Sequence, residues 1–461
     1  MAVGLNWGWG WVLIRLAIFF PILSLLFLSQ RFWYRGAWRL TARIENSHLR
    51  RALRGVCVAA IIAVIVAAFD GMQDNHGHII PRGSMITALA GLWFASALFA
   101  YIAVKTVHSF EWLWLQGKKL RSSAEPAPRP AKTPWQHGEL VSPPQVTQPS
   151  NREFLENPSR RYFFQTATAV AGALPFLGAL YGFAAERLHY VIHEVQVPIA
   201  NLPPALEGLR IAQISDIHMS GYMTREQVRR AVDMVNELAP DLAVVTGDFI
   251  TGAGDSLVDC VAEITRIRAQ LGTWGCNGNH EIYAGFEDLA QELFARSGMR
   301  LLREENAQLN WRGAAFNIIG VDYQRQRTAE GQPFRMLQNV QPLVRRDMPN
   351  ILLSHNPNAF PRAAQIGIEL TLAGHTHGGQ VQVEILDHSF SPARFITDFT
   401  AGLYHRPLAK TSSPSSLGAS SVSHPRPAAA ALYVNRGLGT VGAPIRIGVP
   451  PEITLLILKR A

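Results

Sequence analysis

Carboxylate, amide and imidazole side chains recur along the second half of the sequence, each time directly after a short apolar run. The first such pair, Asp216 and His218, follows the apolar run at 209–214. An aspartate and a histidine two residues apart, where an extended chain begins to turn, can both reach one metal ion. The later residues of these kinds are Asp248, Asn279, His280, His355, His375 and His377. Oxygen and imidazole ligands without thiolates suit Mn, Fe, Zn or a similar divalent ion.

Alternating strands and helices would bring these residues together. Apolar runs at 209–214 and 241–250 predict strands, and a helix is expected between them at 224–238, where Thr224 and Gln227 match a capping box. Further expected elements are a helix at about 256–269, a strand near 273, a helix at about 286–295, and strands at 314–322, 350–353 and 368–373. This order is typical of an α/β sandwich, in which sites lie beyond the carboxyl ends of the strands.

The charge of the protein is divided unevenly along its 461 residues. Residues 1–184 carry 18 Lys and Arg against 8 Asp and Glu, whereas 185–461 carry 25 against 26. A catalytic domain that binds nucleic acid would be expected to carry a basic face of its own, so nucleic acid is not an expected partner. Cys57, Cys260 and Cys276 do not form a disulfide framework. A single bridge between Cys260 and Cys276 and two buried free thiols both remain open.

The first part of the chain contains four apolar stretches with few charges, at 11–28, 55–69, 86–104 and 166–185. Because a membrane span needs about 20 apolar residues, we expect four transmembrane helices. Lys and Arg are concentrated after the first and third stretches, so these connections are expected on the cytoplasmic side. The catalytic domain would then lie on the periplasmic or extracellular side of a bacterial inner membrane. The expected organisation is a membrane region at 1–121, a Pro-rich cytoplasmic linker at 122–158, a fourth span at 159–185 and a catalytic domain at 186–461.

The start of the fourth stretch resembles a twin-arginine export signal. Ser159, Arg160 and Arg161 are followed by Phe163 and Phe164 and then by an Ala- and Gly-rich apolar segment. This predicts a transient interaction with the twin-arginine translocase, which exports folded proteins. Arg160 and Arg161 could instead serve only as cytoplasmic anchors of the span.

The order of the polar motifs resembles the calcineurin-like metallophosphoesterase superfamily. The motifs are D-x-H, G-D, G-N-H-E, a single His and G-H-x-H, within about 205–461. The extended forms ISDIH and LTLAGHTHGGQ, and the tail from 432, are similar to bacterial membrane-associated phosphohydrolases of the YkuE and YaeI type. A Ser- and Pro-rich insertion at 406–430 departs from that pattern, and we expect it to be a surface loop.

The resemblance implies a metallophosphoesterase-type β-sandwich flanked by helices, with two divalent metal ions that share Asp248. It implies that Asp216, His218 and His377 complete one site, and that Asn279, His355 and His375 complete the other. A hydroxide bridging the two metals would attack the phosphorus. His280 would stand beside the leaving oxygen as a general acid or charge stabiliser, and Glu281 would either orient a neighbouring group or be structural.

Together these features predict a membrane-anchored phosphohydrolase that cleaves phosphoester or pyrophosphate bonds. A near-neutral domain tethered to a bilayer favours an amphiphilic, lipid-linked substrate. Two alternatives stay open: a phosphodiesterase for soluble substrates, and a membrane receptor or scaffold that uses the same fold without catalysis.

Overall fold

The computed structural model describes residues 6–71, 85–124, 158–325, 335–385, 388–395, 397–408 and 429–461. The chain forms two compact units, one from Met1–Ile61 and Trp93–Gly178 and the other from Ile62–Leu92 and Ala179–Ala461. The predicted linker at 122–158 lies outside the described residues, except that 122–124 end one helix and Pro158 begins the next. Most of the predicted insertion, 409–428, lies outside them as well.

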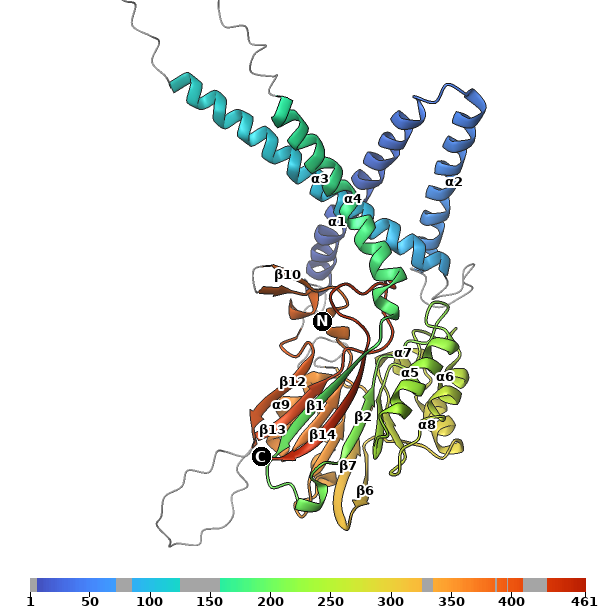
Figure 1. Cartoon of the computed structure of the whole chain (residues 1–461), viewed down its shortest axis with the longest axis vertical. Helices are drawn as coiled ribbons and strands as arrows, with labels where there is room; N and C mark the ends of the chain where they lie inside the picture. Colours follow the sequence, from blue (N-terminus) through green and yellow to red (C-terminus); the bar gives the residue numbers. More distant parts are fainter. Residues whose placement is uncertain are drawn as a thin grey trace, which may run out of the picture. The chain divides into compact units, whose positions relative to one another are not determined.

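Four long helices cover the four apolar stretches (Figure 1). They are α1 (Asn6–Thr41), α2 (Ser47–Gly71), α3 (Met85–Ala124) and α4 (Pro158–Ala184). Within the part of the chain that the structure describes, two segments are long and apolar enough to cross a membrane, Ala88–Lys118 and Ser159–Leu188. The expected number of four spans is therefore corrected to two candidates. The apolar part of α2 is short because it begins only after Arg54 and ends at Asp70, and the apolar stretch of α1 is interrupted by Arg15.

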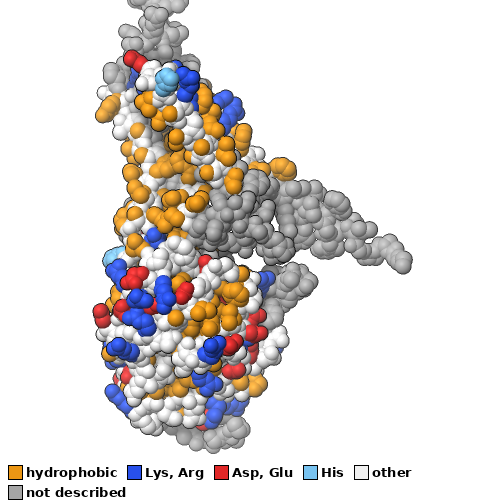
Figure 2. Space-filling model, turned by 90° about the vertical axis from the view of Figure 1, so that its right-hand side faces the viewer, with side chains coloured by type: hydrophobic (Ala, Val, Ile, Leu, Met, Phe, Trp, Pro, Cys, Tyr) orange, Lys and Arg blue, Asp and Glu red, His pale blue; other side chains and the backbone are white. Residues whose placement is uncertain are grey.

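Exposed apolar side chains are concentrated on these helices. Phe99, Phe110 and Leu177 are each about 60% exposed or more (62%, 66% and 60%). Among the described residues after 185, the exposed large apolar side chains are Ile192, Val258, Tyr283 and Leu289. On the face drawn in Figure 2, hydrophobic side chains cover the helices, whereas Lys, Arg, Asp and Glu are scattered over the sheet-containing unit. This distribution is typical of helices that contact lipid and of a domain that contacts water.

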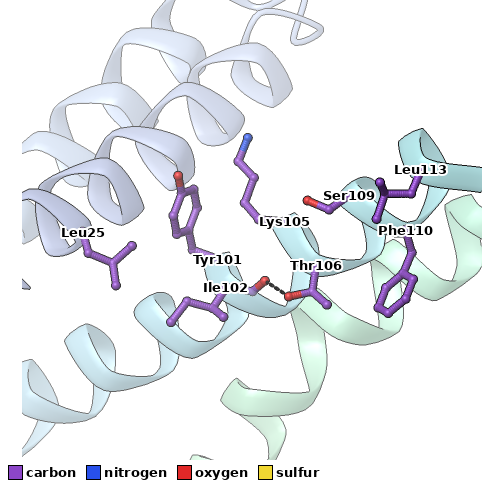
Figure 3. Close-up of a pocket in the computed structure, with 8 residues that line it drawn as sticks. All are labelled: Leu25, Tyr101, Ile102, Lys105, Thr106, Ser109, Phe110 and Leu113. Atoms are coloured by element: carbon purple, nitrogen blue, oxygen red, sulfur yellow. Dashed lines mark hydrogen bonds between the residues drawn. The ribbon is translucent and has the colours of Figure 1, made fainter. Parts of the chain in front are cut away.

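A pocket of about 380 Å³ lies between α1 and α3, lined by Leu25 of α1 and by Tyr101, Lys105 and Thr106 of α3, among others (Figure 3). The Thr106 hydroxyl donates to the carbonyl of Ile102 at 2.9 Å, so it is satisfied within its own helix. None of the lining residues is a predicted metal ligand.

The second unit is built on two six-stranded mixed sheets. The first sheet has the order β1 (Val191–Ile199), β14 (Glu452–Arg460), β2 (Arg210–Ile214), β3 (Leu242–Thr246), β4 (Thr273–Cys276) and β5 (Arg300–Leu301). The second has the order β12 (Gly402–Pro407), β13 (Ala429–Val434), β9 (Leu370–Ala373), β8 (Asn350–Leu353), β7 (Ala314–Gly320) and β6 (Glu305–Trp311). A separate hairpin joins β10 (Val383–Ile385) to β11 (His388–Phe390). The ends of the predicted insertion thus belong to the paired strands β12 and β13.

The core lies between the two sheets. Apolar residues of the first sheet, such as Ile211 and Val244, share one buried cluster with residues of the second, such as Ile318 and Leu372. Helices α5 (Arg225–Glu237), α6 (Leu257–Ile264) and α8 (Glu287–Arg296) belong to a second cluster on the other face of the first sheet (Figure 1). Helix α9 (Phe360–Ile366) packs against the second sheet. The predicted α/β class, with mixed sheets flanked by helices, is confirmed.

The predicted capping box forms at the start of α5. The backbone N–H of Thr224 donates to Gln227 Oε1 at 2.7 Å, and that of Gln227 donates to Thr224 Oγ1 at 3.4 Å. Helix α6 ends at Ile264 rather than near 269. The Asn236 side chain bonds the Arg266 carbonyl at 3.0 Å and the Arg268 N–H at 2.7 Å, which satisfies that backbone outside a helix.

The cysteines form no bridge. Cys260 and Cys276 are both free and buried, so the disulfide that the sequence left open is absent.

Candidate metal centre

The predicted ligands follow the carboxyl ends of five strands in the two sheets. In the first sheet β2, β3 and β4 are parallel neighbours, and in the second β8 and β9 are parallel neighbours. Asp216 and His218 follow β2, Asp248 follows β3, Asn279 and His280 begin α7 (Asn279–Ala284) just after β4, His355 follows β8, and His375 and His377 follow β9. Both sheets therefore contribute to the candidate site.

Several of these residues have backbone angles in the left-handed region. The φ angles of Asp216, His218, Asp248, His375 and His377 are 48°, 48°, 54°, 74° and 52°. A non-glycine residue in this conformation costs about 1 kcal/mol or more, and such residues cluster at functional sites. Hydrogen bonds hold the first turn in place: Asp216 N–H donates to the Gly247 carbonyl and His218 N–H to the Asp248 carbonyl, both at 3.0 Å.

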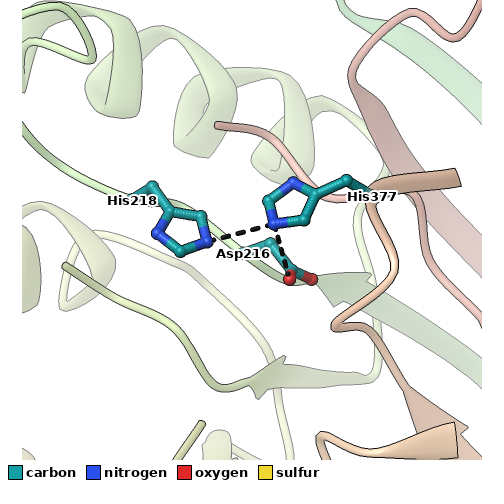
Figure 4. A group of neighbouring side chains, drawn as sticks. All are labelled: Asp216, His218 and His377. Carbon is teal, nitrogen blue, oxygen red and sulfur yellow. Dashed lines mark hydrogen bonds and ion pairs between the residues drawn. The ribbon is translucent and has the colours of Figure 1, made fainter. Parts of the chain in front are cut away.

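Asp216, His218 and His377 form the first of three groups whose potential ligand atoms lie within 4.8 Å of one another. Figure 4 shows the three side chains turned toward a common point. His377 Nε2 lies 3.2 Å from His218 Nε2 and 3.3 Å from Asp216 Oδ1. Two imidazole nitrogens and a carboxylate oxygen that face each other in a buried position are a suitable ligand set for a divalent cation. This group is called the first subsite below.

Asp248, His355 and His375 form another group of the same kind, called the second subsite. His355 Nδ1 lies 2.6 Å from the Thr246 carbonyl, so this nitrogen carries a hydrogen and Nε2 is the ring nitrogen that could bind a metal ion. His355 Nε2 lies 3.1 Å from Asp248 Oδ2 but makes no hydrogen bond. Asn279 Oδ1 is likewise buried without a hydrogen-bond partner. Because a buried polar atom without a partner is costly, both atoms fit a role as metal ligands.

His280 belongs to the third group, with His218 and Asp248. Its backbone N–H donates to Asp248 Oδ1 at 2.9 Å, and its Nδ1 lies 2.6 Å from the Thr251 carbonyl. The Nδ1 hydrogen is therefore committed to Thr251 and Nε2 remains available. The ring stands edge-on to that of His218, with centroids 4.7 Å apart.

Burial and mutual charge shift the pKa values of the centre strongly. Burial raises the pKa of Asp216; at Asp248 burial acts in the same direction, but the neighbouring histidines hold its pKa well below the usual range. Burial lowers the pKa of His375 to about 3 and that of His377 well below its ordinary value, so both are neutral, as metal ligation requires. At His355 burial is outweighed by the two aspartates, which raise its pKa to about 10, so a cation bound at the second subsite would have to displace the proton on Nε2. The centre thus attracts positive charge.

Glu281 has a structural role that the sequence did not settle. Its buried carboxylate accepts the backbone N–H groups of Asp248 and Gly278, both at 2.9 Å, that of Phe249 at 2.8 Å and that of Ile250 at 3.3 Å. Glu281 therefore fixes the turn of Asp248 and the start of α7, and it makes no hydrogen bond to the His280 ring among the described contacts.

Glycines next to the ligands allow close packing that the motif prediction did not explain. A Cβ atom on Gly278 would lie 2.1 Å from Asp248 Oδ1, and one on Gly374 would lie 2.2 Å from Asp216 Oδ2. The available signal in the sequence is a glycine directly before each of Asp248, Asn279 and His375.

Comparison with known proteins agrees with this geometry. Residues 209–379 match the family described as calcineurin-like phosphoesterase. This stretch is a calcineurin-like metallophosphoesterase domain. The metallophosphoesterase domain includes all the predicted ligands, and the predicted resemblance is confirmed.

Three relatives show how far the similarity extends. The chain is 32% identical to a transmembrane protein with metallophosphoesterase domain from Bos taurus, over 58% of this chain and 56% of that protein. It is 29% identical to the protein of the same description from Danio rerio, over 64% and 63%. It is also 29% identical to the metallophosphoesterase YkuE of Bacillus subtilis, over 66% of this chain and 99% of YkuE. The chain thus spans less than two thirds of the length of the two vertebrate proteins.

Proposed function

We propose that this chain is a membrane-anchored phosphohydrolase that uses two divalent metal ions to cleave phosphoester or pyrophosphate bonds. The observation that carries the proposal is the convergence of buried carboxylate and imidazole atoms from five strand ends into groups within 4.8 Å. A structural core would not place so many titratable groups together without partners.

In this proposal the first subsite would hold one ion and the second subsite, with Asn279, would hold the other, and Asp248 would serve both. Asp248 Oδ2 lies 3.4 Å from His218 Nε2 as well as 3.1 Å from His355 Nε2, which supports a shared role. Two cations bound there would neutralise phosphoryl oxygens and lower the pKa of a coordinated water. The ligand set suits Mn, Fe or Zn.

His280 is the proposed proton donor to the leaving oxygen. The bond from Nδ1 to Thr251 fixes the ring and leaves Nε2 as the atom that can hold and release a proton. Burial lowers the pKa of His280, which makes its protonated form a stronger acid. A donor of this kind matters most when the leaving group is a poor one.

The two candidate spans support anchoring and orientation. The segment between them carries five Lys and Arg residues, namely Lys119, Arg121, Arg129, Lys132 and Arg152, and Arg160 and Arg161 follow in the first turn of α4. By the excess of positive charge this segment is cytoplasmic, and the domain after α4 lies on the periplasmic or extracellular side of a bacterial inner membrane.

The proposed substrate class is an amphiphilic, lipid-linked phosphate or pyrophosphate. The near-balanced charge of residues 185–461 and the apolar surface of α3 and α4 support it, because a polynucleotide substrate would favour a basic surface. Export by the twin-arginine translocase, suggested by Ser159, Arg160 and Arg161, would carry the domain across the membrane already folded.

The activity can be tested with the full chain in detergent. Mn²⁺-dependent hydrolysis of an aryl phosphate monoester and of an aryl phosphodiester is expected for the wild type and should fall to background in Asp248→Asn. Asp347→Asn is the matched control, since the Asp347 side chain is 61% exposed on the surface. No turnover of either compound with Mn²⁺, Fe²⁺ or Zn²⁺ would support a receptor or scaffold instead.

Orientation and export need separate tests. A reporter that is active only in the periplasm should be active when fused after residue 461, and an inactive fusion would contradict the orientation. Replacement of Arg160 and Arg161 by Lys should block export of the domain, and unchanged export would exclude the twin-arginine route.

A further inference from the structure

Arg446 is a fully buried guanidinium that bonds backbone carbonyls. It donates to the carbonyls of Arg436 and Gly437, both at 2.9 Å, of Val449 at 3.2 Å, and of Gly439 at 2.6 and 3.2 Å. Within the described part of the chain no carboxylate forms an ion pair with it. Burial lowers the pKa of Arg446 only to about 10, so it stays charged at neutral pH. A cation buried in this way needs several well-placed acceptors, and the carbonyls provide them.

Residues 436–439, which Arg446 holds, form a loop directly behind two residues of the first subsite. Leu438 N–H donates to the Ser215 carbonyl at 3.0 Å, and Gly439 N–H donates to the Asp216 carbonyl at 2.7 Å. A Cβ atom on Gly437 would lie 2.5 Å from Asp216 Cβ, and one on Gly439 would lie 2.8 Å from His218 Cβ. The loop therefore determines where the strained turn of Asp216 and His218 can lie.

The backbone beside Arg446 supports the third residue of the same subsite. Ile447 N–H donates to the Gln380 carbonyl at 2.9 Å, and Gln382 N–H donates to the Ile447 carbonyl at 2.8 Å, which ties down the chain that follows His377. A Cβ atom on Gly378 would lie 2.7 Å from Val449 Cγ1. Residues 446–449 thus contact both backbone segments that hold the first subsite: the loop 436–439 behind Asp216 and His218, and the chain that follows His377.

The last turn of α4 rests on this segment. Arg446 N–H donates to the Gly182 carbonyl at 3.3 Å. A Cβ atom on Gly182 would lie 2.7 Å from the Arg446 carbonyl oxygen and 2.9 Å from Ile447 Cγ1. Glycine inside a helix costs about 0.5–1 kcal/mol relative to alanine, so helix stability alone does not favour it here. The close approach to Arg446 does.

We propose that the last turn of α4, through Gly182 and Arg446, positions the first metal subsite. The inference rests on the proposed function in one respect, namely that Asp216, His218 and His377 hold a metal ion. Gly182 and Arg446 are positioning residues. Glycine has no side chain, and the Arg446 guanidinium bonds backbone carbonyls, so neither residue binds the metal itself. The affinity of one of two metal ions then depends on a helix that is a candidate membrane span.

The test measures Mn²⁺ binding to the full chain in detergent, without any substrate. The wild type should bind two Mn²⁺ ions. Gly182→Ala and Arg446→Lys should weaken one binding step about tenfold, as expected when groups that orient ligands are changed, and leave the other step unchanged. Gly117→Ala in α3 is the matched control, because a Cβ atom there meets nothing within 4 Å. His218→Gln should remove the same step that Gly182→Ala weakens.

The possible outcomes separate this inference from the proposed function. Unchanged binding in Gly182→Ala, or equal weakening of both steps, would overturn the positioning role. If Arg446→Lys does not fold, Gly182→Ala decides alone, since alanine strengthens the helix itself. If the wild type binds two Mn²⁺ ions but hydrolyses no phosphate ester, the proposed function is contradicted. The effect of Gly182→Ala on one Mn²⁺-binding step would still test the positioning role. A wild type that binds fewer than two contradicts both.

Discussion

Glu281 Oε2 accepts the backbone N–H of Asp248 at 2.9 Å, so a buried carboxylate fixes the turn that carries the proposed shared ligand. The same carboxylate accepts three further N–H groups. The position of Asp248 is therefore set from behind by a residue that itself offers no free lone pair toward the centre. Arg446 plays the corresponding part behind Asp216, so each of the two carboxylates of the centre has its own support.

Glu281→Gln should weaken the centre, because an amide NH₂ would face backbone N–H donors that now meet a carboxylate oxygen. We expect the free energy of unfolding to fall by about 1–3 kcal/mol and Mn²⁺ affinity to fall about tenfold. Denaturant unfolding and Mn²⁺ titration would measure these changes. Glu305→Gln, at an exposed position, should change neither. Unaltered metal affinity in Glu281→Gln would show that the Asp248 turn does not need this support.

His280→Gln should slow the chemical step and leave metal binding intact. We expect kcat to fall about 10²–10⁴-fold, the range for loss of a general acid, while two Mn²⁺ ions remain bound. The loss should be smaller with an aryl leaving group of low pKa, which needs no proton, than with an alkyl one. Loss of one bound Mn²⁺ would instead make His280 a ligand, and equal loss for both leaving groups would exclude proton donation.

Gly374→Ala should disrupt the first subsite. The new Cβ atom would lie 2.0 Å from Ser215 Oγ and 2.2 Å from Asp216 Oδ2, closer than any real contact, so Asp216 must move. We expect Mn²⁺ binding and hydrolysis both to be lost. Gly254→Ala is the control, because the added Cβ atom there meets nothing within 4 Å. Full metal binding in Gly374→Ala would show that Asp216 can shift without consequence.

Glu263 provides a pH-dependent prediction away from the metal centre. Its carboxylate, 1% exposed, accepts hydrogen bonds from Arg229, Arg225 and Arg266, which lower its pKa from 4.5 to about 2. A pKa depressed in the folded state means that the carboxylate stabilises the fold above about pH 4.5 and loses this contribution as the pH falls toward 2.

Glu263→Gln should therefore reduce the free energy of unfolding by about 1–3 kcal/mol at pH 7, the range for hydrogen bonds to a charged group. The difference from the wild type should shrink steadily below pH 4.5. Unfolding of both proteins at several pH values would measure it, with Glu292→Gln, 61% exposed, as the control. A difference that stays constant down to pH 3 would contradict the assignment.

The residues of the centre are predictable because their signal is local. Each follows a short apolar run, and the carboxyl ends of parallel strands meet at one end of a sheet. Asp216, Asp248 and His355 could be assigned to strand ends in this way, and the structure brings them within reach of one another. The left-handed backbone of these turns is indicated only indirectly, by the glycines before Asp248 and His375.

The residues that hold the metal ligands in place, such as Arg446 and Gly182, could not be predicted, since their roles depend on contacts between distant segments. Arg446 lies between two isoleucines in the sequence, with nothing to show that its guanidinium is buried. Gly182 reads as one of several small residues in an apolar helix. Four membrane spans were expected where two candidates are found, because the apolar stretch at 55–69 is short and lies in a helix whose first turns carry Arg50, Arg51 and Arg54.

The most direct test of a two-metal hydrolase is stoichiometric reconstitution. The full chain would be stripped with a chelator and returned to activity with Mn²⁺, while hydrolysis of an aryl phosphodiester is followed. We expect chelation to abolish hydrolysis and activity to rise to a plateau at two Mn²⁺ ions per chain. Hydrolysis that survives complete metal removal, or a plateau at one ion per chain, would contradict this expectation.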